Sequence, residues 1–151
     1  MLYLGADHRG FKKKEELKKY LREMGVKFLD LGNTIFDPND DYPDFAKRVA
    51  EKVSKDPKSK GILICGSGIG MSISANKFKR VRAGLCLNEK MARLSKEDTN
   101  CNILCLSADF LSLDKMKKIV KVWLRAKFSQ RRRQKRRIKK ISLYENENIK
   151  I

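Results

Sequence analysis

The residues with the clearest chemical potential lie in one stretch, residues 61–77, which reads GILICGSGIGMSISANK. The apolar run at residues 62–64 has no polar face, which predicts a buried parallel strand. Cys65 follows at the carboxyl end of this strand, and a glycine-rich turn over residues 66–70 leads into a helix expected from residue 71. A thiol beside a helix N-terminus has a lowered pKa and becomes a usable base or nucleophile, so we expect this of Cys65.

The glycine-rich turn has the composition of an anion-binding loop. Consecutive backbone N–H groups over residues 66–70 can point into one concavity, and the positive end of the next helix also favours an anion there. Two other interpretations stay open at this point: Cys65 as a small buried hydrophobic residue, and the glycines as a tight turn only. The stretch is neither the dinucleotide motif G-x-G-x-x-G nor a P-loop, which ends in Gly-Lys-Ser/Thr.

The composition limits the classes of protein to which this stretch can belong. The 151 residues suit one domain with a sizeable core. There is no apolar run of 18 residues and no secretory signal pattern at the start, so we expect a cytoplasmic protein without a membrane span. The cysteines lie mostly in apolar runs without a C-x-x-C pair, and the only histidine is His8. This argues against zinc and a disulfide framework and favours a reducing compartment. The cysteines are Cys65, Cys86, Cys101 and Cys105.

The charge is strongly positive and partly concentrated near the C-terminus. Lys and Arg number 36 against 18 Asp and Glu, a net charge of +18, and residues 131–140 read RRRQKRRIKK. Such a run is usually a solvated face or tail, but it can also bind nucleic acid or a phosphorylated small molecule. Only Phe128 lies nearby, and the lack of interleaved aromatic residues argues against nucleic acid.

The elements that position the stretch alternate along the chain. We expect strands over residues 2–6, 26–31, 60–65, 81–87 and 102–106. We expect helices over residues 11–24, 42–55, 71–77, 89–97, 113–126 and 128–141, with the last residues frayed. Five alternations predict an α/β fold, a single doubly wound, Rossmann-like domain with a five-stranded parallel sheet and a basic C-terminal helix.

The division of the chain follows from this alternation. Residues 1–127 form the α/β part, and residues 128–151 form a basic helix and tail of the same domain. Ligands of doubly wound sheets bind at the carboxyl ends of the strands. We expect three polar turns to meet at that edge, over residues 7–10, 65–70 and 94–102.

Four segments carry a resemblance to a known family. GADHRGF near the start, DYPDFA at residues 41–46, GILICGSGIGMSISANK, and ARLSKEDTNCNIL at residues 92–104 resemble ribose-5-phosphate isomerase B and its relatives, over residues 2 to about 141. That family includes galactose-6-phosphate and allose-6-phosphate isomerases. The resemblance implies an aldose–ketose isomerase of phosphorylated sugars without metal or cofactor, with ribose 5-phosphate to ribulose 5-phosphate as the preferred reaction. A hexose 6-phosphate isomerase and a catalytically weak sugar-phosphate-binding relative remain alternatives.

The resemblance also implies roles for individual residues. Cys65 would move a proton between adjacent carbons through an enediolate, and Ser67 would help to move a proton between its oxygens. Backbone N–H groups of the turn would hold the oxyanions, and losing one such donor typically costs ~10²–10³ in rate. Tyr42 would pack over the cysteine, with plain core packing as the alternative. The other substrate-binding positions implied are Asp7, His8, Gly66, Gly68, Ile69 and Gly70.

The C-terminal half both follows the family pattern and departs from it. Arg133 and Arg137 match two arginines that clamp the sugar phosphate, and at i and i+4 they share a helix face. In the family the site is built across a dimer, so we expect a homodimer or tetramer in which the C-terminal helix serves a partner subunit. Asp98 and Thr99 stand where the family has a ring-opening histidine and an asparagine, and Asp109 replaces an arginine. A carboxylate can act as acid or base at position 98 only with a suitably raised pKa, for which Asp109 is one candidate neighbour.

Overall fold

The computed structural model describes residues 1–147 and contains one five-stranded parallel sheet. Its strands are β1 (Leu2–Ala6), β2 (Phe28–Asp30), β3 (Lys60–Cys65), β4 (Ala83–Leu85) and β5 (Ile103–Ser107), in the spatial order β2-β1-β3-β5-β4. Its helices are α1 (His8–Glu23), α2 (Tyr42–Lys55), α3 (Ile69–Ala75), α4 (Glu89–Glu97), α5 (Leu113–Arg125) and α6 (Arg132–Glu147). The predicted doubly wound α/β fold is confirmed.

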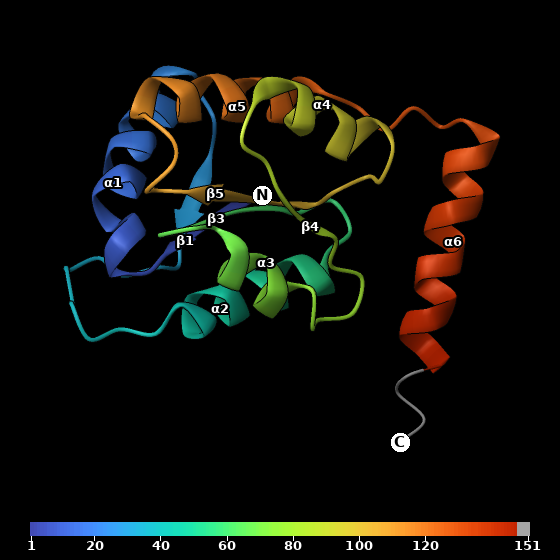
Figure 1. The fold of residues 1–151 in the computed structure, drawn as a ribbon, viewed down its shortest axis with the longest axis horizontal. Helices are drawn as coiled ribbons and strands as arrows, with labels where there is room; N and C mark the ends of the chain where they lie inside the picture. The colour runs from blue at the N-terminus through green and yellow to red at the C-terminus, as the bar shows by residue number, and fades with distance from the viewer. Residues whose placement is uncertain (148–151) are drawn as a thin grey trace.

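Helices cover both faces of the sheet (Figure 1). One face packs against α1, α4 and α5, and the other packs against α2 and α3. Side chains alternate between these layers along β3: Ile62 and Ile64 join the first core cluster, whereas Leu63 and Cys65 join the second. Cys65 therefore lies on the α2–α3 side of the sheet, at the end of a central strand.

The predicted element bounds are right where a strong local signal exists. β3, α2 and α4 have the predicted ends, and Asn88 caps α4 by accepting a hydrogen bond from the Met91 N–H at 2.8 Å. α1 begins three residues early because the buried Asp7 carboxylate caps it, accepting from Gly10 N–H at 3.0 Å. β2 and β4 are shorter than predicted, because each is an edge strand with a ladder on one side only.

The edge strand β4 is closed by a side chain. The Asn76 carboxamide donates to the Ala83 carbonyl oxygen at 2.9 Å and accepts from the Ala83 N–H at 2.8 Å. These two hydrogen bonds imitate those of a neighbouring strand. The outward-facing backbone groups of Ala83 are therefore already paired within the chain.

The basic helix α6 stands away from the two layers, on the opposite side of the molecule from α1 (Figure 1). It begins at Arg132, four residues later than predicted, and it continues to Glu147. Residues 142–147 are thus helical where fraying was expected, and the rest of that expectation, residues 148–151, lies outside the described part of the chain. A cavity of about 780 Å³ separates α6 from the β4 edge, with Ile141 and Tyr144 among its lining residues. Across residues 1–147, no helix is long and apolar enough to cross a membrane.

Candidate active site

Cys65 ends β3 beneath the glycine-rich turn. Its side chain is buried, and its Sγ accepts a hydrogen bond from the Gly68 N–H at 3.2 Å. Gly68 has a positive φ of 79°, and a Cβ there would lie 2.6 Å from the Leu85 side chain and 3.0 Å from the Leu106 backbone. Glycine is required at position 68 for both reasons, and the resulting turn brings an N–H donor onto the sulfur.

Burial raises the pKa of the Cys65 thiol, with the neighbouring Asp7 acting in the same direction. Hydrogen bonds from backbone N–H groups of Met71, Gly68 and Ser67 lower it, but less than burial raises it. The expectation of a lowered pKa from the helix N-terminus is therefore wrong for this chain. α3 has only seven residues, and withdrawal of the sulfur from water outweighs the N–H donors around it.

Two backbone N–H groups of the glycine-rich turn already donate hydrogen bonds to atoms of the same segment. The Gly68 N–H donates to Cys65 Sγ, and the Ile69 N–H donates to Ser67 Oγ at 3.2 Å. Ser67 is half-buried at the mouth of the turn. The Gly66 carbonyl oxygen accepts from the Ser107 hydroxyl at 2.7 Å, which ties the turn to the end of β5. The turn is thus tied to the end of β5, and its predicted role as an anion-binding concavity beside the sulfur stays a prediction.

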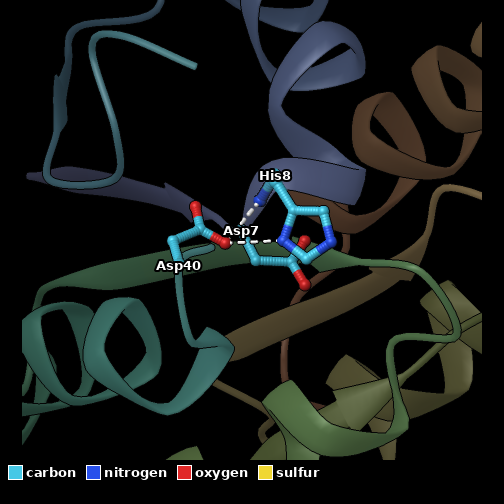
Figure 2. A group of neighbouring side chains, drawn as sticks. All are labelled: Asp7, His8 and Asp40. Atoms are coloured by element: carbon cyan, nitrogen blue, oxygen red, sulfur yellow. Dashed lines mark hydrogen bonds and ion pairs between the residues drawn. The ribbon is translucent and has the colours of Figure 1, made fainter. Parts of the chain in front are cut away.

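Asp7 and His8 lie at the start of α1, beside the loop that follows β2 (Figure 2). His8 Nδ1 lies 2.7 Å from Asp40 Oδ1, and the His8 backbone N–H donates to the same oxygen at 2.8 Å. The hydrogen bond to Asp40 raises the pKa of His8, which favours the imidazolium and therefore an anionic ligand. Burial raises the pKa of Asp7. The sequence reasoning placed Asp40 only in a turn-rich loop, because nothing local indicates a contact with His8, 32 residues away.

Asp7, His8 and Asp40 also satisfy the spacing of a metal-binding group, with ligand atoms within 4.8 Å of one another. The structure gives those atoms other partners. His8 Nδ1 and Asp40 Oδ1 bond to each other, and Asp7 Oδ1 accepts from the Gly10 N–H in the first turn of α1. We interpret these contacts as orienting the His8 ring and favouring its charged form.

Tyr42 begins α2 and lies against the glycine-rich turn. A Cβ at Gly70 would lie 2.6 Å from Tyr42 Cε2, so the ring is in contact with the Gly70 backbone. The Tyr42 side chain is 40% exposed, which argues against plain core packing. Tyr42 therefore lies against the glycine-rich turn, and its predicted packing over Cys65 stays a prediction.

A second group of predicted site residues lies at the opposite edge of the sheet. The turn over residues 94–102 precedes β5, and Asn102 accepts a hydrogen bond from the N–H of Gly61, at the beginning of β3. The expectation that this turn joins the other two at the carboxyl edge is therefore wrong. A segment that leads into a parallel strand lies at the amino edge, whereas a segment that follows one lies at the carboxyl edge.

Asp98 and Thr99 consequently lie far from Cys65 of the same chain. Cys65 is four residues beyond Gly61, so the two edges are separated by roughly 13 Å at ~3.3 Å per residue. The Asp98 carboxylate accepts a hydrogen bond from Gln134 at 3.2 Å and lies 4.0 Å from Arg131, while Thr99 is exposed. Arg133 and Arg137 are exposed on α6, which carries Gln134.

Asp109 was a candidate neighbour for Asp98, and the structure contradicts this. Asp109 follows β5 at the carboxyl edge, where Oδ2 lies 2.5 Å from Arg9 Nη2. The sequence indicated only that Arg9 lies in the turn over residues 7–10. Its guanidinium lies against Gly66, as a Cβ at that position would be 2.8 Å from Arg9 Nε.

The fold and the site define a doubly wound α/β protein with a buried thiol under an N–H-rich turn at the carboxyl edge of its sheet, where such folds bind small ligands. The chain belongs to the Ribose/Galactose Isomerase family, whose sequence pattern matches residues 2–141.

Individual members of this family are similar over nearly the whole chain. The crystal structure of ribose-5-phosphate isomerase B from Mycoplasma genitalium with bound ribulose 5-phosphate matches with a TM-score of 0.93 and 44% identity, covering 97% of this chain and 96% of that one. The Clostridium thermocellum ribose-5-phosphate isomerase B structure matches at 0.93 with 39% identity, covering 97% and 98%. Ribose-5-phosphate isomerase B of Escherichia coli is 40% identical over 87% of this chain and 88% of its own length.

Proposed function

We propose that this protein interconverts ribose 5-phosphate and ribulose 5-phosphate, with Cys65 as the group that moves the carbon-bound proton. The observation that carries the proposal is the position of the Cys65 sulfur, at the carboxyl end of a central strand and 3.2 Å from the Gly68 N–H. Family membership, and the ribulose 5-phosphate bound to a relative of 44% identity, support the choice of these two sugar phosphates as substrate and product.

The chemistry needs one base and fixed oxyanion donors. The Cys65 thiolate takes the proton from C2 of the open aldose, and the electron pair moves into the C1 carbonyl to give an enediolate. A proton passes from the oxygen on C2 to the oxygen on C1 through Ser67, and Cys65 returns its proton to C1, which leaves the ketose. Donors of the turn stabilise the charge that develops on these oxygens. The hydrogen bond to Asp40 raises the pKa of His8 and so favours the charged imidazolium, which attracts the anionic substrate.

The rest of the site comes from a second copy of the chain. Asp98 and Thr99 lie at the opposite edge of the sheet from Cys65. Arg133 and Arg137 are on α6, whose Gln134 bonds to Asp98, so we assign all four residues to the site of a partner subunit. A two-fold dimer would bring these residues of one subunit to the thiol of the other. Exposed apolar side chains around the carboxyl edge fit such an interface, since Phe36, Ile69 and Phe110 are 54%, 53% and 73% exposed. In such a dimer, the basic helix α6 of one subunit would be part of the active site of its partner, so it belongs to the same functional domain as the α/β part.

Asp98 occupies the position of the family's ring-opening histidine in this arrangement, opposite the partner's thiol. Its hydrogen bond from Gln134 leaves the carboxylate half-exposed and able to meet a sugar hydroxyl. Histidine is the side chain suited to proton exchange at neutral pH, so we expect its replacement to make ring opening limit turnover of the cyclic sugar. The four thiols are free and buried, which suits the reducing cytoplasm that we propose as the compartment.

The experiment incubates the purified protein with ribose 5-phosphate and, separately, with galactose and allose 6-phosphates, and measures ketose. Cys65→Ala should abolish turnover of ribose 5-phosphate while retaining binding of the sugar phosphate. Cys86→Ala is the matched control, because Cys86 is a buried thiol of the other core cluster. Near-parental turnover by Cys65→Ala would refute the assignment, and preferential turnover of a hexose 6-phosphate would change the substrate.

A further inference from the structure

Arg9 occupies an unusual position at the carboxyl edge. It is the second residue of α1, and its side chain turns back over Gly66, the residue that directly follows Cys65. A Cβ at Gly66 would lie 2.8 Å from Nε and 3.0 Å from Cζ of Arg9. Glycine at position 66 thus makes room for a guanidinium that covers the first peptide of the turn.

Asp109 holds this guanidinium in place. The Arg9 Nη2 to Asp109 Oδ2 distance is 2.5 Å, and the loop that carries Asp109 is itself fixed. The Asp109 N–H donates to the Gly66 carbonyl oxygen at 3.0 Å, and the Lys13 ammonium donates to the carbonyl oxygens of Ala108 and Leu111. Arg9 therefore has a preferred direction although its side chain is 58% exposed.

The distribution of charge at the carboxyl edge indicates a role for Arg9 in addition to its ion pair with Asp109. Three carboxylates gather here, Asp7, Asp40 and Asp109, and the proposed substrate carries a phosphate dianion. Arg9 brings a permanent positive charge to the same surface. A guanidinium has five N–H donors, and Asp109 engages one nitrogen, so donors remain for a second anion.

We propose that Arg9 binds the phosphate group of the sugar phosphate and that Asp109 positions its guanidinium. The proposal rests on the proposed function and assigns to this chain's own carboxyl edge a phosphate contact in addition to the arginines of the partner's α6. A phosphate presents three oxygens, so it accepts arginines from two subunits at once.

The test is steady-state kinetics with ribose 5-phosphate on Arg9→Ala and Arg9→Met. The phosphate is charged equally in the ground state and the transition state, so KM should rise about tenfold while kcat stays within about twofold. Arg9→Met keeps an apolar stem over Gly66, and it should lose as much as Arg9→Ala. Lys12→Ala removes a positive charge from an exposed position of the same helix and should leave KM unchanged.

A double variant tests whether positions 9 and 109 face the same phosphate. Arg9→Ala with Asp109→Arg moves the guanidinium to the other member of the pair, so KM should return to within about threefold of the parent value. Unchanged KM in Arg9→Ala, parental KM in Arg9→Met, an equal loss in Lys12→Ala, failure of the double variant to recover, or a fall in kcat alone would each overturn the proposal.

Calorimetry with inorganic phosphate separates this proposal from the proposed function. Parent protein that isomerises none of the sugar phosphates would refute the function. Phosphate binding that weakens in Arg9→Ala and not in Lys12→Ala would still support the contact, and equal binding by all three proteins would overturn it.

Discussion

The candidate site residues lie at two opposite edges of the sheet. Together with the proposed two-fold dimer, this separation leads to a quantitative prediction for dimers that combine two different variants. One subunit carries Cys65→Ala, and the other carries Arg133→Ala with Arg137→Ala. In the mixed dimer one site combines the intact thiol with the intact α6 of its neighbour, while the other site lacks both. We therefore expect one working site per mixed dimer.

The magnitudes follow from the same geometry. Cys65 and the amino edge are separated by roughly 13 Å along the sheet, so one chain cannot supply both groups to one substrate. Loss of a charge-assisted hydrogen bond costs ~1.5–3 kcal/mol, or roughly ten- to a hundredfold in affinity per arginine. The arginine variant alone should thus retain about one per cent of parental kcat/KM or less, and the Cys65→Ala dimer essentially none. The mixed dimer should recover about half.

The assay co-expresses the two variants with different affinity tags and purifies the mixed species through both. Its kcat/KM for ribose 5-phosphate is then compared with the parent and with each variant dimer. A doubly tagged parental dimer controls for the tags. Mixed dimers of normal mass and thermal stability that show no recovery would refute the reasoning, because they would place the thiol and the arginines of one site in the same chain.

Three further predictions concern single positions. Asp40→Asn removes the charged acceptor that raises the pKa of His8, so the pH above which KM for ribose 5-phosphate climbs should move down toward about 6.5; an unmoved KM profile would contradict this. Gly68→Ala forces a Cβ against the Leu106 backbone at a positive φ and should cost roughly 2 kcal/mol or more in urea unfolding, and an unchanged midpoint would count against it. Asp98→His should speed conversion of ribose 5-phosphate while Asp98→Asn changes it little; abolition by Asn would make Asp98 an essential catalytic group.

The fold was predictable from the sequence because its signals are local. The central strands β3 and β5 are short, mostly apolar runs, and helix starts such as the one at Asn88 have a recognisable cap. The edge strands were overextended because an apolar run does not reveal how many neighbours it will pair with. The same locality placed Cys65 correctly at the end of β3.

The candidate site was predictable only in part, because its remaining features depend on contacts between distant residues. The pairs His8–Asp40 and Arg9–Asp109 join positions 32 and 100 residues apart. The raised pKa of Cys65 reflects burial under α2 and α3, which outweighs the local N–H donors. No local sequence pattern indicates these contacts, whereas the direction of the chain alone would have assigned the turn over residues 94–102 to the amino edge.

The pairing of Asn76 with Ala83 bears on how this protein assembles. An open edge strand is a template on which other chains add strands without limit, and such growth ends in fibres. The Asn76 side chain occupies the outward N–H and carbonyl of Ala83, and β4 has only three residues. Any contact between copies of the chain at this edge must therefore be made through side chains, because a further strand cannot pair with the outward backbone groups of Ala83.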